Sequence, residues 1–283
     1  MWLVSLVLSY AHAAPPAQVW GPPCVVPVLE EVDKGEGTST LRYLVHVEPH
    51  DGSGLTLTLE RFELVALEGQ PLKPEEQELA QKMLGRLTTP PAFIGADGQL
   101  AGVPADLRTL RELLDKLDIR RAEQRGMLKM FKSDELVGLM AADLARLWWA
   151  WSGAWVGEIP PAGGSITGEA PYLGGDGVRG PVPAIWSREV DASGADTLRA
   201  ELAVPPSRLS MEWMLLMGSG AVGTLEVGPG RSVVAEAQLD PATGRPLHTR
   251  LEVVDRLTGG AAHSQYRDTR WLWDEAQGCA VGP

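Results

Sequence analysis

The sequence is poor in cysteine: Cys24 and Cys279 are its only two among 283 residues. No Cys-x-x-Cys motif is present to form part of a zinc site. The two cysteines lie near opposite ends of the chain, and in an oxidising compartment such a pair is typical of a disulfide. In the chain-entropy model a bridge that closes so long a loop contributes about 5 kcal/mol. The alternative is a pair of free thiols.

The sequence also lacks a long apolar run. The N-terminal apolar stretch, Trp2 to Tyr10, has roughly half of the ~20 residues that a membrane-spanning helix needs. Its length suits the core of a signal peptide, and Ala11-His12-Ala13 places small residues where a signal peptidase reads them. We therefore expect residues 1–13 to be a cleavable signal, although no Lys or Arg precedes the run. The alternative is the first buried strand of a cytosolic protein.

A lipid-attachment motif is missing as well. Gly21-Pro22-Pro23 precedes Cys24, in place of the Leu-small-small pattern that ends the signal of a lipoprotein. We therefore expect the mature chain to be soluble and untethered, with no membrane span. The expected location is the periplasm or the exterior of the cell.

Basic side chains are outnumbered. The 25 Lys and Arg residues against 37 Asp and Glu give a formal net charge of -12, and the isoelectric point is about 4.9. Nucleic acids and anionic membranes are bound by basic patches that release counterions. The composition therefore disfavours both as partners.

Apolar and polar residues alternate in the N-terminal part and predict strands within residues 24–66. Leu55, Leu57 and Leu59 face one way and polar side chains the other, as in a half-buried antiparallel strand. Residues 74–152 are expected to form a block of two to three helices. Proline followed by acidic residues makes a good first helical turn, and leucines then recur at helical spacing.

Glycine and proline are frequent over residues 157–183, where large apolar residues are few, and this predicts a long loop. Residues 184–273 show only strand patterns, separated by turns such as the one that begins at Asp240-Pro241. The order of strands, helices and strands predicts a single α+β domain over residues 14–283. We expect a large antiparallel, half-barrel-like sheet with two to three helices packed on one face.

A glycine motif, Gly218-Ser219-Gly220-Ala221-Val222-Gly223, formally matches the dinucleotide-binding pattern. Such a site needs a helix whose N-terminal amides hold the pyrophosphate. Gly228-Pro229-Gly230 interrupts the segment after barely two turns, so a glycine-rich hairpin is the better interpretation. No cofactor is expected.

His46, Glu48 and His50 are spaced so that they share one face of a strand and are weak candidates for metal ligands. No second pair of ligands lies nearby, and solvated polar residues at a strand end explain them more simply. No metal is therefore expected. Ser165 and Ser219 lack the Gly-x-Ser-x-Gly elbow, although a hydrolase triad can assemble in space. No catalytic residue is assigned.

Tryptophan is abundant, with ten residues against three phenylalanines. Trp148, Trp151 and Trp155 are three and four residues apart and form one stripe on the last predicted helix. Such a stripe is usually a helix face packed on a sheet. The alternative is the lining of an amphiphile pocket, because tryptophan combines a large apolar area with a polar N–H. Trp271 and Trp273 alternate on the last predicted strand and are expected to meet the same region.

The meander over residues 184–273, with its Asp-Pro-x-Thr-Gly-Arg-Pro-Leu turn at residues 240–247, resembles bacterial periplasmic lipoprotein carriers of the LolA and LppX families. It is also similar to uncharacterised secreted proteins of that style. The resemblance implies a half-barrel whose concave face is plugged by helices and an apolar cavity for acyl chains. It carries over no binding residue.

These observations favour a non-enzymatic periplasmic or secreted protein that binds an apolar or amphiphilic ligand, such as a lipid, between sheet and helices. An envelope protein–protein interaction module, with residues 157–183 as the contact, is the alternative. A hydrolase without a recognisable motif is a third hypothesis. The candidate ligand contacts are Trp148, Trp151, Trp155, Trp271 and Trp273.

Overall fold

The computed structural model describes the chain in segments. They are residues 19–33, 35, 37–51, 54–84, 88–89, 91–102, 144–155, 159–173, 179–190, 196–204, 230–240, 242–256 and 262–279. Within them the fold is mainly an open antiparallel sheet accompanied by helices, in agreement with the expected α+β class. The predicted signal, the glycine motif and most of the predicted central helices lie outside the described residues.

Two groups of strands, one from each part of the chain, make up the sheet. The first group is β1 (Cys24–Asp33), β2 (Thr38–Pro49), β3 (Leu55–Leu67), β4 (Gln70–Pro71), β5 (Ala92–Ile94) and β6 (Leu100–Gly102). The second is β7 (Ser165–Leu173), β8 (Arg179–Val190), β9 (Asp196–Val204), β10 (Gly230–Leu239), β11 (Pro246–Arg256) and β12 (Ala262–Trp271). The helical elements are α2 (Pro74–Leu84), a helical stretch of about two turns over residues 144–151, η1 (Gly153–Trp155) and η2 (Trp273–Glu275).

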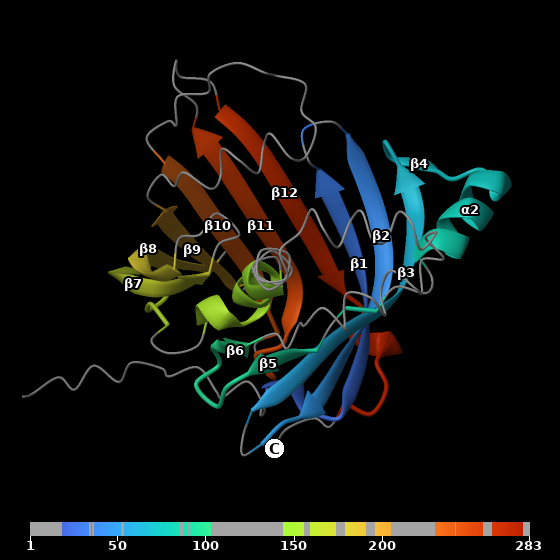
Figure 1. The fold of residues 1–283 in the computed structure, drawn as a ribbon. Coiled ribbons are helices and arrows are strands. Elements are labelled where there is room, and N and C mark those ends of the chain that lie inside the picture. The colour runs from blue at the N-terminus through green and yellow to red at the C-terminus, as the bar shows by residue number, and fades with distance from the viewer. Residues whose placement is uncertain are drawn as a thin grey trace, which may run out of the picture.

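The strands run in the order β6-β5-β3-β2-β1-β12-β11-β10-β9-β8-β7, with the short β4 paired to β3. Each neighbouring pair is antiparallel. The first and last strands therefore meet in the middle of the sheet, where Val28 of β1 lies opposite Trp271 of β12. Figure 1 shows β1 and β12 side by side where the two groups of strands meet.

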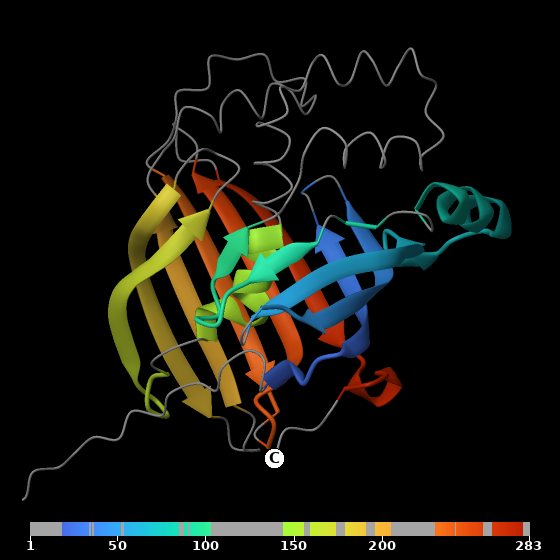
Figure 2. The ribbon, with the colours of Figure 1, turned by 60° about the horizontal axis from the view of Figure 1, so that its bottom comes forward.

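The sheet curls, and the helical segment 144–155 lies inside its curve (Figure 2). The short β5–β6 hairpin crosses over this segment from the other side. Period-two alternation puts every second strand residue on the concave side. The fully buried valines of β1, β2 and β10 lie there, and with the leucines of β3 and β9 they form the core: Val26, Val28, Val45, Val47, Leu55, Leu57, Leu202 and Val233.

The expected loop over residues 157–183 is wrong in its larger part, because β7 and the first half of β8 fall within it. Val182 and Ala184 are buried, whereas Pro181 and Pro183 alternate with them on the exposed side. Pairing of β8 with β9 begins only at Ala184, so both prolines stand where no β9 partner needs their missing N–H. The high proline content led to the prediction of a loop, although buried and exposed residues alternate here as in a strand.

The helix α2 begins at Pro74, as predicted, but none of its described side chains belongs to the core cluster. Apart from Ala80 and Leu84, the side chains described for α2 are exposed. It contacts β3. In sequence, α2 follows β4, which pairs with the end of β3, and precedes Thr88, which forms a bridge with Glu60 of β3. Figure 1 shows α2 at the rim of the sheet, so it shields the edge of β3 and does not cover the sheet face.

The expected disulfide between Cys24 and Cys279 is present, with the two Cα atoms 4.4 Å apart. It joins the start of β1 to the segment after η2. Backbone hydrogen bonds between Val25 and Gln277, at 2.9 Å in both directions, hold the same two segments together. Within the described segments, no helix has the length and hydropathy of a membrane span.

Candidate functional site

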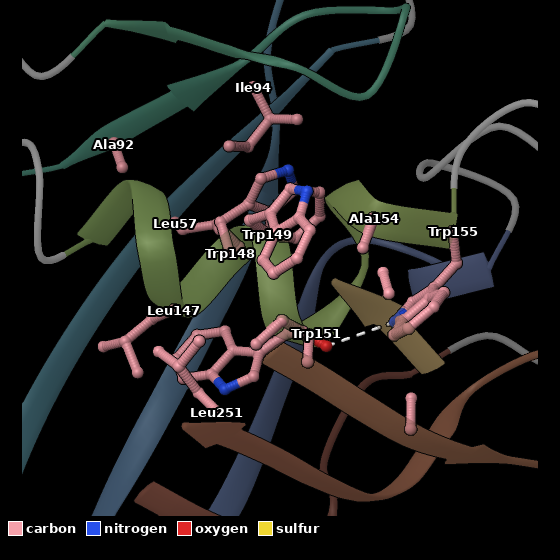
Figure 3. Packing of buried hydrophobic residues seen from close by; sticks show 14 of the residues in the cluster. Leu57, Ala92, Ile94, Leu147, Trp148, Trp149, Trp151, Ala154, Trp155 and Leu251 are labelled. Carbon is pink, nitrogen blue, oxygen red and sulfur yellow. Dashed lines mark hydrogen bonds between the residues drawn. The ribbon is translucent and has the colours of Figure 1, made fainter. Parts of the chain in front are cut away.

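The helical segment 144–155 is buried on all sides at its C-terminal end. Trp148, Trp151 and Trp155 are at most 6% exposed, as expected for the predicted stripe, and Trp149 on another face is only 7% exposed. Figure 3 shows Ile94 of β5 close to this segment on one side and Leu251 of β11 on the other. A helix that is apolar all round is a buried helix, and the β5–β6 hairpin supplies its second wall.

Trp20 is the centre of an aromatic cluster that the sequence did not reveal. Its ring centroid lies 5.8 Å from that of Trp148, 5.0 Å from Trp271 and 5.7 Å from Trp273. Trp151 adds an edge-to-face contact with Trp271 at 5.0 Å. The structure therefore brings together four of the five tryptophans predicted as ligand contacts. Trp20 precedes β1 among prolines, where no periodic pattern marks it.

Trp155 belongs to a different part of the segment. Its indole N–H donates to the carbonyl of Ala150 at 3.2 Å, as Figure 3 shows. Next to it, Trp186 of β8 donates to the carbonyl of Ala154 at 2.9 Å. This end of the segment is thus held to β8, while the indole N–H of Trp20 donates to the hydroxyl of Ser152 at 3.4 Å.

The indole N–H groups of the cluster are used within the protein. Trp148 donates to the carbonyl of Gly98 at 2.8 Å, Trp273 to that of Pro246 at 2.6 Å, and Trp271 to the hydroxyl of Thr249 at 3.5 Å. The polar N–H groups of these tryptophans therefore donate to groups in strands and turns of the protein itself. The prediction that Trp273 lies on the last strand is wrong. Strand β12 ends at Trp271, and Trp273 is the first residue of η2.

The Asp240–Leu247 turn anchors this cluster. The carboxylate of Asp240 accepts from the backbone N–H of Ala242 at 2.9 Å and from the hydroxyl of Thr243 at 2.7 Å. These hydrogen bonds, that from Thr243 first, lower the pKa of Asp240. Gly244 takes a φ of +70°, which favours glycine, and it turns the chain toward Arg245.

Arg245 is only 8% exposed and points into the cluster. Its Nε donates to the carbonyl of Val19 at 3.0 Å, and its guanidinium lies 4.7 Å from the ring centre of Trp273. Burial lowers the pKa of Arg245, and the neighbouring Asp240 opposes that effect. The turn thus fastens Trp273 and the segment before β1.

A row of polar side chains interrupts the apolar concave face. Thr249 of β11 lies opposite Thr269 of β12, which lies opposite Glu30 of β1, and all three are at most 2% exposed. Arg267, one step along β12 on the same face, places its Nη1 3.7 Å from the Glu30 carboxylate. We call these four residues the polar row. No sequence pattern marked it, because Glu30 stands in an acidic pair that is common in such a composition.

The histidine candidates go to separate partners. His46 Nε2 lies 2.9 Å from Glu60, whereas His50 stacks on Phe93 with ring centroids 4.4 Å apart. Glu48 is exposed. Among the residues that the structure describes, no three His, Cys, Asp or Glu side chains converge as a metal site.

The convex face carries charged side chains in cross-strand pairs. Arg199 of β9 pairs with Glu236 of β10, and His248 Nε2 lies 2.5 Å from Asp268 on β12. The Tyr266 hydroxyl donates to Glu31 at 2.8 Å, and this contact raises the pKa of Tyr266. No described contact places a serine hydroxyl beside His46, His50 or His248. Ser219 lies outside the described residues. No arrangement of the described residues supports the hydrolase hypothesis.

No protein-family model matches this sequence, and a search of curated proteins finds no significant match.

Proposed function

We propose that this protein is a non-enzymatic binder of an apolar or amphiphilic ligand, such as a lipid, held between the curved sheet and segment 144–155. One observation carries the proposal. Apart from the polar row, the concave face is apolar across both groups of strands, and the indole N–H groups of Trp148 on the helical segment and Trp271 on the sheet are already hydrogen-bonded within the protein. Such a lining attracts hydrocarbon by removing it from water.

The half-barrel interpretation supports this proposal. A sheet of eleven strands in one path, at a spacing of ~4.8 Å between strands, is about 50 Å wide along its curve. A single helix with its side chains is about 10 Å in diameter. Segment 144–155 therefore faces only a part of the concave surface. The ligand would lie along that surface with Trp151, Trp148, Trp271 and Trp273 at one end and Trp155 at the other.

Location in the periplasm or outside the cell belongs to the same proposal. The chain forms the Cys24–Cys279 disulfide, and disulfides persist in oxidising compartments but are rare in the cytosol. A carrier of amphiphiles in such a compartment would take its ligand from, or deliver it to, the cell envelope.

The first test is native mass spectrometry of the protein purified without detergent. We expect an added mass of lipid size that disappears after extraction with organic solvent. The delipidated protein should then enhance the emission of a dansyl-labelled fatty acid. Protein that is uniformly empty and leaves the probe unchanged would overturn the proposal.

A pair of variants on β9 distinguishes a space that holds a ligand from a core that is already filled by side chains. Ala200 is fully buried on the concave face, and Ala203 is exposed on the opposite face of the same strand. If the ligand lies against β9, Ala200→Leu should weaken probe binding at least tenfold and leave the midpoint of thermal unfolding near that of Ala203→Leu. In a filled core the added methylenes of Ala200→Leu would instead destabilise the empty protein by about 1–3 kcal/mol.

An envelope interaction module is the second candidate, and one observation favours it. Val65 and Leu67 at the end of β3 are 39% and 44% exposed, and Leu79 of the adjacent α2 is 61% exposed. Pull-down from envelope extract with the Leu79→Glu variant tests this corner, with Leu247→Glu as a control at another exposed leucine. An unchanged set of partners would count against the module.

A further inference from the structure

The segment after β12, residues 272–279, runs along the start of β1, and we call it the C-terminal strap. At its beginning the backbone N–H of Leu272 donates to the carbonyl of Pro27 at 3.0 Å. At its end the disulfide joins Cys279 to Cys24, the first residue of β1. The strap is thus attached to β1 at both ends.

The strap lies on the surface of the molecule. None of its residues is buried, and Asp274, Gln277 and Gly278 are exposed. The carboxylate of Glu275 pairs with Arg42 of β2, but the two side chains are 52% and 45% exposed, and an ion pair in water contributes little. The disulfide is therefore a large part of what holds the end of the strap in place.

The sheet has its pairing without the strap. Strand β1 pairs with β2 from Cys24 to Asp33 and with β12 from Val28 to Asp33. Strand β12 ends at Trp271, before the strap begins. Segments with few buried side chains open at a lower free energy than the core does. Release of the strap is therefore a local event.

Trp273 makes the strap a cover for part of the tryptophan cluster. Its ring centroid lies 5.7 Å from that of Trp20 and 6.0 Å from that of Trp271, on which it stacks. Trp20 is fully buried and Trp271 is 4% exposed, whereas Trp273 is half-buried. Release of the strap would therefore expose apolar surface of the two inner rings.

The two sulfurs of the disulfide differ in their access to solvent. Cys24 is only 2% exposed, whereas Cys279 is half-buried at the end of a surface segment. Thiol–disulfide exchange begins when a thiolate attacks one of the two sulfurs, and its rate depends on access to that sulfur. An external thiolate therefore reaches Sγ of Cys279 more readily.

We propose that the Cys24–Cys279 disulfide is a redox-sensitive site, at which a dithiol reductant attacks Cys279, releases the C-terminal strap and uncovers Trp20 and Trp271. The attacking thiolate bonds to Sγ of Cys279, and the S–S bond breaks with its electron pair on Sγ of Cys24, which takes up a proton. The second thiolate of the reductant then displaces Cys279, which is protonated in turn. The reductant becomes a disulfide and the chain a dithiol, so the partner is a dithiol–disulfide oxidoreductase.

Amide hydrogen exchange of the oxidised and reduced protein tests the release. The amides of Val25 and Gln277 report on the strap, because each donates to the carbonyl of the other at 2.9 Å. On reduction they should lose about tenfold more protection than the amides of the β2–β3 ladder, and their exchange should be insensitive to low urea, as for a local opening. An equal loss across strap and sheet would mean global unfolding and would overturn the proposal.

Two variants separate the disulfide from the other contacts of the strap. The Cys24→Ala, Cys279→Ala variant should show the exchange pattern of the reduced protein without any reductant. Glu275→Gln is the matched control, since it removes the ion pair with Arg42 and keeps the disulfide. It should change the protection of Gln277 about fivefold at most. An effect as large as that of reduction would refute the role of the disulfide.

A monothiol identifies the sulfur that is attacked. The folded protein is incubated with glutathione, free thiols are alkylated, and the peptides are analysed by mass spectrometry. The mixed disulfide should form on Cys279 and the alkyl group should be found on Cys24. The reverse distribution would contradict the assigned point of attack.

Acrylamide quenching of tryptophan fluorescence tests the cover. Reduction should raise the quenching of the wild-type protein, because Trp20 and Trp271 become accessible. In Trp273→Ala the covering ring is already absent while the disulfide remains, so reduction should add little. An equal rise in both proteins would show that Trp273 does not act as the cover.

Discussion

Arg245 connects three distant parts of the chain through one side chain. It leaves the turn after β10, donates to the carbonyl of Val19 before β1, and lies over the ring of Trp273 after β12. The guanidinium can do this because it is planar and carries several N–H donors, which lysine does not match.

Replacement of Arg245 should therefore destabilise the fold. Arg245→Met keeps the apolar stem but removes the hydrogen bond to Val19 and the contact with Trp273, and we expect a loss of about 2–3 kcal/mol. Urea unfolding followed by tryptophan fluorescence measures it. Arg250→Met is the matched control, since Arg250 also lies 4.7 Å from an aromatic ring, that of Tyr266, but on the convex face. A loss no larger than that of the control would contradict the role of Arg245.

Asp240 should give the turn a pH-dependent contribution. Its pKa is lowered in the folded protein, so its stabilisation is complete well above the ordinary value of 3.8 and is lost as the pH falls through the lowered value. At pH 7, Asp240→Ala should unfold with about 1 kcal/mol less free energy. That difference should shrink as the pH is lowered from 5 to 2. Thermal unfolding over this range tests it, and a difference that stays constant with pH would contradict the mechanism.

At the scale of elements, β7 and β8 depend on their attachment to segment 144–155. Trp186→Phe keeps most of the ring but removes the hydrogen bond to the carbonyl of Ala154, and we expect a loss of about 1–2 kcal/mol. Hydrogen exchange should show faster exchange of amides in β7 and β8, with β1 and β2 unchanged. Ile185→Val, at a neighbouring residue that is 52% exposed, should leave all four strands unchanged. Uniform acceleration across the sheet would argue against a local attachment.

Elements with a strict period were predictable from the sequence. The alternation of Leu55, Leu57 and Leu59 gave β3 its correct buried face, and Pro74 marked the start of α2. Strand β7 and the first half of β8 were predicted as a loop, and in β8 the buried Val182 and Ala184 alternate with the exposed Pro181 and Pro183. Short-range pattern cannot show that a helix will fill the space above such small residues.

The candidate site was predictable only in part, for a related reason. Helical spacing identified Trp148, Trp151 and Trp155 as one stripe, but a stripe has one face, and Trp149 is buried by a hairpin from elsewhere in the chain. Trp20 and the polar row depend on strand register across the centre of the sheet. Register between distant strands is set by tertiary packing and leaves no local trace in the sequence.

At the scale of the whole molecule, the disulfide should contribute a large part of the stability. It links residues 255 apart in sequence, and removal of such a bridge typically costs about 2–5 kcal/mol. The Cys24→Ala, Cys279→Ala double variant should show this loss in urea unfolding, with the slope against urea concentration compared as a check on the unfolded state. Reduction of the wild-type protein should reproduce the effect. Equal stability of oxidised and reduced protein would contradict the expectation.

The pairing of β1 with β12 in the middle of the sheet has a consequence for the order of events in synthesis. Strand β1 is among the first parts of the described chain to be made, and its neighbour β12 is the last strand. The centre of the sheet therefore cannot form until residue 271 has been synthesised, and contacts so distant in sequence fold slowly. Until then the pairing that joins the two groups of strands is missing, so the complete sheet closes only at the end of synthesis.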